Sequence, residues 1–291
     1  MPSPKKILVT GGSGKAGPWV IADLLEHGYD VVNVDTRPST QVHTFRADLT
    51  DLGQVYGVLE GRDAVIHLAA IPWPGEHAPE TVFRNNVMST FNILQAACVL
   101  GIKKVVMAGS ESALGFPFAF RPFNPLYLPI DEAHPLLAQD AYGLGKTIIE
   151  ELGRGYIRRD PTMSIISLRL SYILRPEDYA EELRVAWADP GRNAFNLWAY
   201  IDARDVALSC RLAVASPQPG FDAFYIAAPD TLMRESTLDL VNRYFPGVEQ
   251  VAEGFGGRMS PLDGRHAEQG LGFKAQHTWE MVMAGRERTS T

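Results

Sequence analysis

A tyrosine and a lysine stand four residues apart, as Tyr142 and Lys146, in a segment whose apolar spacing predicts a helix. Residues at this spacing lie on one helical face, so the phenol and the ammonium can act together. A free tyrosine titrates near ~10, and a close cation favours its phenolate. We therefore expect Tyr142 to remove or deliver a hydroxyl proton, with Lys146 lowering its pKa. The alternative is a surface pair.

Ser110 follows an apolar run over residues 104–108 that predicts a strand. Ligands bind at the carboxyl ends of strands in parallel α/β sheets, so the Ser110 hydroxyl is placed to orient a reacting oxygen. Ser110, Tyr142 and Lys146 form the predicted catalytic set. Such a set suits hydride exchange between a carbinol carbon and a nicotinamide.

A glycine-rich turn follows the first predicted strand, with glycines spaced Gly-x-x-Gly-x-x-Gly at positions 11, 14 and 17. Gly11 permits a tight turn, Gly14 lets backbone amides approach a pyrophosphate, and Gly17 permits close packing of helix on strand. We expect the pyrophosphate to contact Gly11, Gly14, Lys15, Ala16 and Gly17. Since Ala16, not Ser or Thr, follows Lys15, the turn does not match a nucleoside-triphosphate loop.

An acidic residue, Asp35, ends the second predicted strand about 20 residues after the turn, where a ribose hydroxyl needs an acceptor. The Asp35 carboxylate repels a 2′-phosphate, which favours NAD over NADP. Arg37, two residues later, offsets this in part, so NADP stays open. The alternative for Arg37 is a solvated loop cation.

The chain has 291 residues, a net charge of −7 and 46% hydrophobic residues, which is ordinary globular composition. The acidic balance argues against nucleic acid and anionic membranes as partners. Because no leader pattern or apolar run of about 18 residues is present, we expect a cytoplasmic protein. Cys98 and Cys210 lie in separate predicted helices, so we expect reduced thiols and no metal site.

Apolar runs alternate with amphipathic stretches up to about residue 215, which predicts a Rossmann-type, doubly wound parallel α/β sheet with a small C-terminal substrate lobe. The runs are residues 7–9, 31–34, 64–66, 105–107 and 165–168, and the longest helices are expected over 81–100 and 141–160. We expect residues 1–175 and 197–230 in the dinucleotide-binding domain, 176–196 and 231–291 in the lobe, and a disordered end at 286–291. The aromatic-rich loop 115–140 covers the substrate, or only packs the lobe interface.

The chain resembles an extended short-chain dehydrogenase/reductase of the NAD-dependent epimerase/dehydratase type. The matching segments span about residues 5–230 and are 10–17, Asp35, 47–49, 67–70, 85–87, 110–115, 142–146 and 200–206. The resemblance implies that Asp48 and Leu49 contact the adenine, that Leu68, Ala69 and Ala70 line the nicotinamide ribose, that Asn86 steadies the backbone beside the cofactor, and that Lys146 holds the ribose hydroxyls.

Structural roles stay open for several of these residues: Asp48 as a turn cap, His67 as a satisfied strand-end histidine, and Asp205 as a local cap or pair. The resemblance also implies a homodimer in which the helices over 81–100 and 141–160 form a four-helix bundle.

Two segments depart from the family. Dehydratases carry two acidic residues after the catalytic hydroxyl, but here Glu111 is followed by Ser112, which argues against dehydration. Nucleotide-sugar epimerases carry an asparagine where this chain has Ser171, before Tyr172, which argues against a nucleotide-diphosphate substrate.

These departures point to a smaller substrate, a polyol, free sugar or sugar acid, as in the uronate-dehydrogenase-like branch. We take Ser110, Glu111, Ser112, Ser171 and Tyr172 as substrate residues. The candidate carboxylate contacts are Arg121, Arg175 and Arg184, with a surface cation as the alternative for each.

The sequence therefore predicts an NAD(P)-dependent oxidoreductase that exchanges hydride with a secondary alcohol of a sugar-like substrate. An epimerase that keeps its NAD bound is the alternative. A non-catalytic dinucleotide sensor is a minor one, because Tyr142 and Lys146 are both present.

Overall fold

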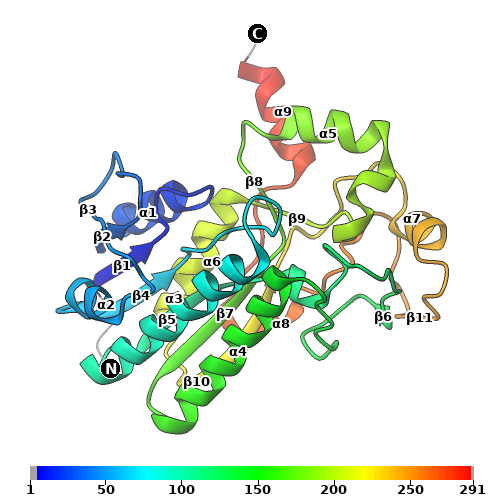
Figure 1. Ribbon diagram of the computed structural model, residues 1–291. Helices are drawn as coiled ribbons and strands as arrows, with labels where there is room; N and C mark the ends of the chain where they lie inside the picture. The colour runs from blue at the N-terminus through cyan, green and yellow to red at the C-terminus, as the bar shows by residue number, and fades with distance from the viewer. Residues whose placement is uncertain (1–4, 290–291) are drawn as a thin grey trace.

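The computed structural model describes residues 5–289, and a seven-stranded parallel sheet forms its centre. The strand order is β10-β7-β5-β4-β1-β2-β3, and every neighbouring pair runs parallel (Figure 1). The strands are β1 (Lys6–Thr10), β2 (Asp30–Val34), β3 (Thr44–Phe45), β4 (Ala64–His67), β5 (Lys104–Ser110), β7 (Ser164–Leu170) and β10 (Gly220–Ile226). The strand order reverses between β1 and β4, as in Rossmann folds, so the predicted fold class is confirmed.

Helices cover both faces of this sheet, which is why its central strands are apolar on both sides. The helices α1 (Gly17–Glu26), α6 (Ala203–Ala215) and α8 (Arg265–Leu271) pack together on one face. The other face carries α2 (Leu52–Leu59), α3 (Pro79–Leu100) and α4 (Ala141–Arg159). Within the described part of the chain, no helix is both long and apolar enough to cross a membrane. Cys98 and Cys210 are free thiols on α3 and α6, as expected.

The two longest helices begin and end close to their expected limits because local signals fix their ends. Pro79 occupies the first turn of α3, and Gly101 ends that helix in the left-handed conformation at φ +76°. The Asp140 carboxylate caps α4 by accepting hydrogen bonds from the backbone N–H groups of Tyr142 and Gly143. The homodimer predicted from these two helices stays a prediction, which sedimentation can test.

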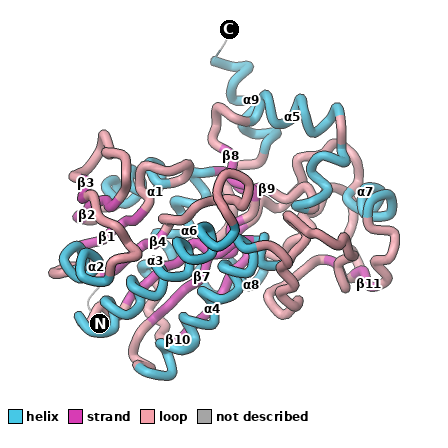
Figure 2. Tube along the Cα trace, viewed as in Figure 1, coloured by secondary structure: helices cyan, strands magenta, loops and turns pink. Residues whose placement is uncertain are grey.

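Short elements surround the far end of the sheet (Figure 2). They are η1 (Glu111–Leu114), β6 (Tyr127–Leu128), β8 (Tyr172–Leu174), α5 (Tyr179–Ala188), η2 (Pro190–Asn196), β9 (Tyr200–Asp202), α7 (Thr237–Tyr244), β11 (Gln250–Val251) and α9 (Trp279–Thr289). Two apolar clusters hold them, one around the buried Trp198 and one around Tyr179. The expected disorder at 286–291 stays a prediction: α9 is described through Thr289, and residues 290–291 lie outside the described residues.

A buried ion pair joins α4 to the sheet. Glu150 accepts two hydrogen bonds of 2.9 Å from the Arg169 guanidinium, and both side chains are almost fully buried. Bidentate geometry satisfies both carboxylate oxygens, as a charge pair in a low-dielectric interior requires. Since Glu150 lies one turn after Lys146, the pair holds the segment of α4 that carries the predicted catalytic residues.

Replacing Glu150 with alanine leaves the Arg169 charge buried without its carboxylate. We expect E150A to lower the free energy of unfolding by about 3–5 kcal/mol, measured by denaturant titration. The matched control is E151A, which removes an exposed carboxylate paired only with Arg154 and should change stability by about 0.5 kcal/mol or less. Equal losses in the two variants would show that the buried pair has no special role.

Candidate active site

A cleft of about 1340 Å³ opens at the carboxyl ends of β1 and β4, where the strand order reverses. This volume exceeds that of an ordinary drug-sized pocket, so the cleft has room for a dinucleotide and a second molecule. The cleft brings together almost all of the predicted site residues: Gly11, Gly14, Lys15, Ala16, Gly17, Asp35, Arg37, Asp48, Leu49, Leu68, Ala69, Ala70, Ser110, Glu111, Ser112, Tyr142, Lys146, Ser171 and Tyr172. Asn86 lines an adjoining pocket.

The glycine turn has the conformation that its sequence predicts. Gly11 has φ +71°, and a Cβ there would lie 2.7 Å from the Ala69 nitrogen. The role predicted for Gly17 needs a correction: a Cβ there would lie 2.4 Å from the carbonyl oxygen of Gly12, so Gly17 packs against the turn, not against a strand. Asn33, buried beneath the turn on β2, accepts a hydrogen bond from the Gly12 N–H. Asn33 was not predicted, because residues 31–34 resemble a continuous apolar run.

Backbone donors at the start of α1 face the cleft. No described residue accepts a hydrogen bond from the backbone N–H groups of Lys15, Ala16 or Gly17. Unpaired N–H groups at a helix N-terminus carry partial positive charge and suit a phosphate. The turn therefore fits the pyrophosphate of a dinucleotide.

The Asp35 carboxylate lies beside the turn at the end of β2. It accepts hydrogen bonds from the backbone N–H groups of Ser13 and Arg37, at 2.9 and 3.0 Å. The Arg37 side chain is exposed and donates to the Ser13 carbonyl oxygen at 2.8 Å, so it is more than a solvated cation. This carboxylate lines the cleft where the resemblance places a ribose.

Asp48 and Leu49 form the next part of the cleft wall. The Asp48 carboxylate also accepts hydrogen bonds from the backbone and hydroxyl of Thr50, so its capping role is present. The Leu49 carbonyl accepts a hydrogen bond from the buried Asn92 side chain of α3. Asp205, in contrast, lies outside the cleft and binds the distant backbone N–H groups of Gln276 and His277, so a purely local pairing was a wrong expectation.

Ser110 is the last residue of β5, and its side chain lies beside the phenol of Tyr142 on α4. Burial raises the pKa of Tyr142 to about 12; the neighbouring Ser110 side chain opposes this, and the charges of Asp140 and Glu111 add to it. The Lys146 ammonium lies 5.5 Å from the Tyr142 ring centroid and donates to the Ala108 carbonyl at 2.6 Å. Burial lowers the Lys146 pKa to about 8.

These shifts correct one expectation. Lys146 was expected to lower the pKa of Tyr142, but burial outweighs the other influences and raises the pKa of this phenol. The three residues are nevertheless brought together in the cleft, with Ser110 beside Tyr142 and Lys146 one helical turn further along.

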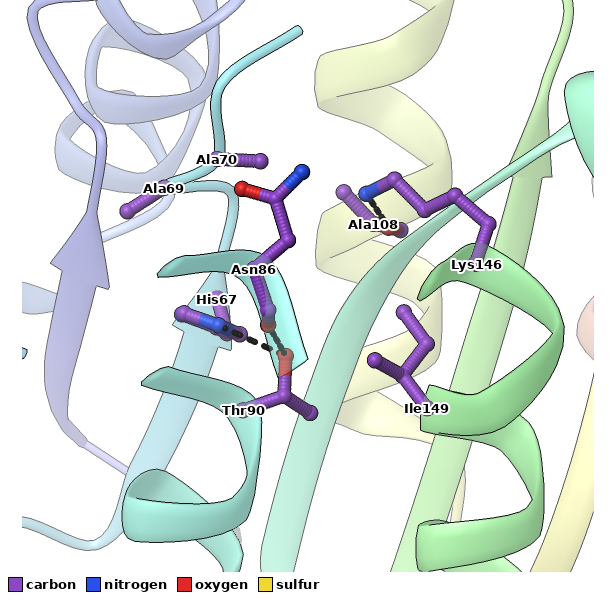
Figure 3. A pocket seen from close by; sticks show the side chains of 8 residues that line it. All are labelled: His67, Ala69, Ala70, Asn86, Thr90, Ala108, Lys146 and Ile149. Carbon is purple, nitrogen blue, oxygen red and sulfur yellow. Dashed lines mark hydrogen bonds between the residues drawn. The ribbon is translucent and has the colours of Figure 1, made fainter. Parts of the chain in front are cut away.

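A small pocket beneath the cleft connects Lys146 to β4 (Figure 3). His67 bonds to the Thr10 hydroxyl at 2.7 Å and to the Thr90 hydroxyl at 3.1 Å, and burial lowers its pKa to about 3. The interpretation of His67 as a satisfied strand-end histidine is therefore correct. Asn86 holds the Ile71 backbone with two hydrogen bonds of 2.8 and 2.9 Å, which is the steadying contact that the resemblance implies.

The predicted substrate residues line the cleft around Tyr142, and they differ in which protein groups already hold them. Burial raises the pKa of Glu111, which favours its neutral carboxylic acid. The Ser171 hydroxyl donates to the Ile226 carbonyl, and the Tyr172 hydroxyl donates to Glu182. Ser112 donates its backbone N–H to the Ser110 oxygen.

The three candidate carboxylate contacts do not line the cleft. Arg175 pairs with Asp178 at 2.7 Å, Arg184 pairs with Glu181, and Arg121 is exposed on the loop 115–140. Three aromatic residues that were not among the predicted site residues also line it: Trp73, Phe118 and Phe195. The proline- and aromatic-rich composition of the loop signalled Phe118, but no local pattern signalled the other two.

The chain belongs to the NAD dependent epimerase/dehydratase family, whose profile matches residues 7–187. It is 30% identical over 190 residues to the UDP-glucose 4-epimerase of Homo sapiens, an alignment that covers 57% of this chain and 52% of the relative. The corresponding epimerase of Bacillus subtilis is 30% identical over 181 residues, covering 56% and 51%. The chain thus spans about half the length of the curated relatives it matches.

Solved structures share the fold over nearly the whole chain. A short-chain dehydrogenase/reductase superfamily protein from Agrobacterium tumefaciens, solved with bound NAD, has a TM-score of 0.73 and 24% identity, with 98% of each chain covered. A mutated uronate dehydrogenase has a TM-score of 0.66 and 18% identity, covering 98% of this chain and 86% of the other. At these identities the likeness shows the fold.

Because His67 is neutral in the folded protein and titrates at about 3, whereas an unfolded histidine titrates near 6.5, the unfolded chain binds the extra proton between these values. Acidification therefore destabilises the fold. We expect His67 to contribute a loss of about 2 kcal/mol between pH 7 and pH 5, measured as the difference between wild type and H67Q in urea titrations. The exposed His27, changed to glutamine, is the control and should keep the wild-type pH dependence. The same slope in H67Q would contradict the assignment.

Proposed function

We propose that this protein is an NAD-dependent dehydrogenase that oxidises a secondary alcohol on a sugar-like substrate or, in the reverse direction, reduces the corresponding ketone. The observation that carries the proposal is that Ser110, Tyr142 and Lys146 meet at the wall of a cleft that also contains the glycine turn. We also propose the two-lobe division at residues 1–175 with 197–230, and 176–196 with 231–291.

In this proposal the glycine turn and the N-terminus of α1 hold the pyrophosphate, and Asp35 accepts a hydrogen bond from a ribose hydroxyl. NAD supplies the hydride acceptor when bound. Ser110 orients the substrate oxygen, and Tyr142 removes its proton as the carbon is oxidised. The Lys146 ammonium lies one helical turn from Tyr142 and favours the Tyr142 phenolate once NAD and substrate occupy the cleft.

The two positions that depart from the family, Ser112 and Ser171, support a dehydrogenase. Elimination of water needs both an acid and a base beside the sugar, and Glu111 is followed by Ser112. The asparagine that nucleotide-sugar epimerases carry is absent here, which argues against a nucleotide-diphosphate substrate. Position 171 is a serine whose hydroxyl donates to the Ile226 carbonyl. A second candidate, an epimerase that retains its cofactor, is favoured by the 30% identity to UDP-glucose 4-epimerases.

Removal of the Tyr142 hydroxyl tests the proposal. We expect Y142F to lower kcat/KM by about 10²–10⁴ and to retain NAD binding, because only the proton-transfer group is lost. The assay follows reduced nicotinamide by absorbance with NAD and D-glucose, D-galactose, D-galacturonate or UDP-glucose. Accumulation supports the dehydrogenase, and turnover without accumulation supports the epimerase.

The control is Y156F on the same helix, which removes a hydroxyl bonded to Gln95 outside the cleft and should keep wild-type kinetics. If Y142F matched wild type on every active substrate, the assigned role of Tyr142 would be wrong.

Cofactor preference provides a separate test. We expect wild type to prefer NAD over NADP, and D35S to reduce that preference about tenfold or more, because the ribose acceptor is lost while Arg37 stays to receive a 2′-phosphate. Dissociation constants for both cofactors measure the ratio. The matched control is D30S, which changes an exposed residue at the opposite end of β2. An unchanged ratio in D35S would rule out Asp35 as the discriminating group.

A further inference from the structure

The part of the cleft next to the catalytic tyrosine differs in character from the cofactor part. We define the substrate half as the lining residues from segments 71–77, 111–118 and 172–173, together with Phe195: Ile71, Pro72, Trp73, His77, Glu111, Ser112, Pro117, Phe118, Tyr172, Ile173 and Phe195. Most of these side chains are apolar or aromatic. The basic residues Lys15, Arg37, Arg46 and Lys146 line the cleft outside these segments.

A row of aromatic rings leads outward from the catalytic phenol. The Phe118 ring lies 6.4 Å from the Tyr142 ring, edge to face at 89°. The Phe195 ring lies 6.4 Å beyond Phe118 and is stacked at 28° to it. Both phenylalanines keep more than a third of their surface exposed, as does Trp73. Exposed aromatic surface gathered in a cleft marks a binding surface.

The backbone holds these rings in place at a conformational cost. Phe118, Leu197 and Trp198 have φ angles of +61°, +55° and +58°, and within residues 5–289 no other residue except glycine has a positive φ. Such conformations persist only where the surroundings enforce them, and they cluster at ligand sites. Trp198 is fully buried and donates to the Pro190 carbonyl at 2.8 Å, so it anchors the segment that carries Phe195.

No lysine or arginine is among the residues that form this half. Two lining cations border it, and both have protein partners: Lys15 pairs with Asp178 at 3.4 Å and lies over the Tyr172 ring, and Lys146 donates to the Ala108 carbonyl at 2.6 Å. Arg175 is also paired with Asp178, and Arg192 is exposed and does not line the cleft. Carboxyl groups are present as well, with Glu111 in the wall and Glu182 bonded to the Tyr172 hydroxyl. An anion placed here loses its water and meets only bordering cations that already have protein partners.

From this geometry we propose that the substrate is uncharged and presents an apolar ring face, which stacks on Phe118 and Phe195 while its secondary alcohol reaches Tyr142. This inference rests on the proposed function and narrows it, because it excludes sugar acids and nucleotide sugars as preferred substrates. Two kinds of substrate present such a face: a neutral pyranose through its C–H groups, and an alicyclic or aromatic alcohol through its ring.

Matched pairs of ligands test the charge requirement. The Y142F protein loaded with NAD is used because its turnover is strongly reduced, so binding can be measured by calorimetry. One pair compares D-galactose with D-galacturonate, and the other compares methyl mandelate with mandelate. We expect the uncharged member of at least one pair to bind tenfold or more tightly than its acid, and the pair that responds identifies pyranose or aryl recognition. Equal or tighter binding of the acid in both pairs, or no binding by either uncharged member, overturns the proposal.

A cation introduced beside the aromatic row tests the placement. We expect F195R to reverse the order within the responding pair, with the acid gaining tenfold or more. The matched control is F120R on the neighbouring loop, because Phe120 is the most exposed large apolar side chain described and does not line the cleft. Identical behaviour of F195R and F120R overturns the assigned surface.

The two proposals fail separately, since binding order is read without turnover. If the dehydrogenase proposal is wrong, reduced nicotinamide does not form, whereas the preference for uncharged ligands and its reversal in F195R remain measurable.

Discussion

Two buried polar contacts, one helical turn apart, fix α4 on the sheet, and the site depends on them. The Lys146 ammonium donates to the Ala108 carbonyl of β5, and the Glu150 carboxylate binds the Arg169 guanidinium of β7. Each contact satisfies a charge that would be costly to bury alone. Tyr142 lies one turn before Lys146 on the same face, so its phenol is directed at Ser110, at the end of β5. The catalytic distances thus follow from how the helix packs.

The two parts of the cleft depend on different kinds of interaction. The cofactor part is built mainly from backbone: the tight turn at Gly11, the contact of Gly17 with Gly12, and the free N–H groups at the start of α1. The substrate half is built from side chains that arrive from three distant segments, around Trp73, Phe118 and Phe195. Backbone geometry tolerates few substitutions, whereas an aromatic wall can change without disturbing the sheet, which lets one fold serve several substrates.

This difference explains how much could be predicted from the sequence. The glycines, Asp35, Tyr142 and Lys146 are signalled by short spacings, because each acts through local geometry on one turn or one helix. The parallel sheet and its longest helices followed from periodicity alone. Phe195 and Trp73 could not be predicted, since only the three-dimensional path of the chain brings them to the cleft. Two of the candidate arginines instead pair with acidic side chains three residues away, Arg175 with Asp178 and Arg184 with Glu181, and this spacing is present in the sequence.

The pKa values of the site link ionisation to occupancy. Burial raises the pKa of Tyr142 to about 12 and lowers that of Lys146 to about 8, so both shifts favour uncharged forms. A phenolate and an ammonium stabilise each other when they lie side by side, and a bound cation would also stabilise the phenolate. A phenolate at Tyr142 therefore needs additional positive charge in the cleft, and an oxidised nicotinamide carries such a charge. An uncharged substrate adds no negative charge that would oppose this, whereas a carboxylate bound next to Glu111 would raise the pKa of the phenol further. The proposed charge of the substrate and the ionisation of Tyr142 are thus two aspects of one electrostatic constraint.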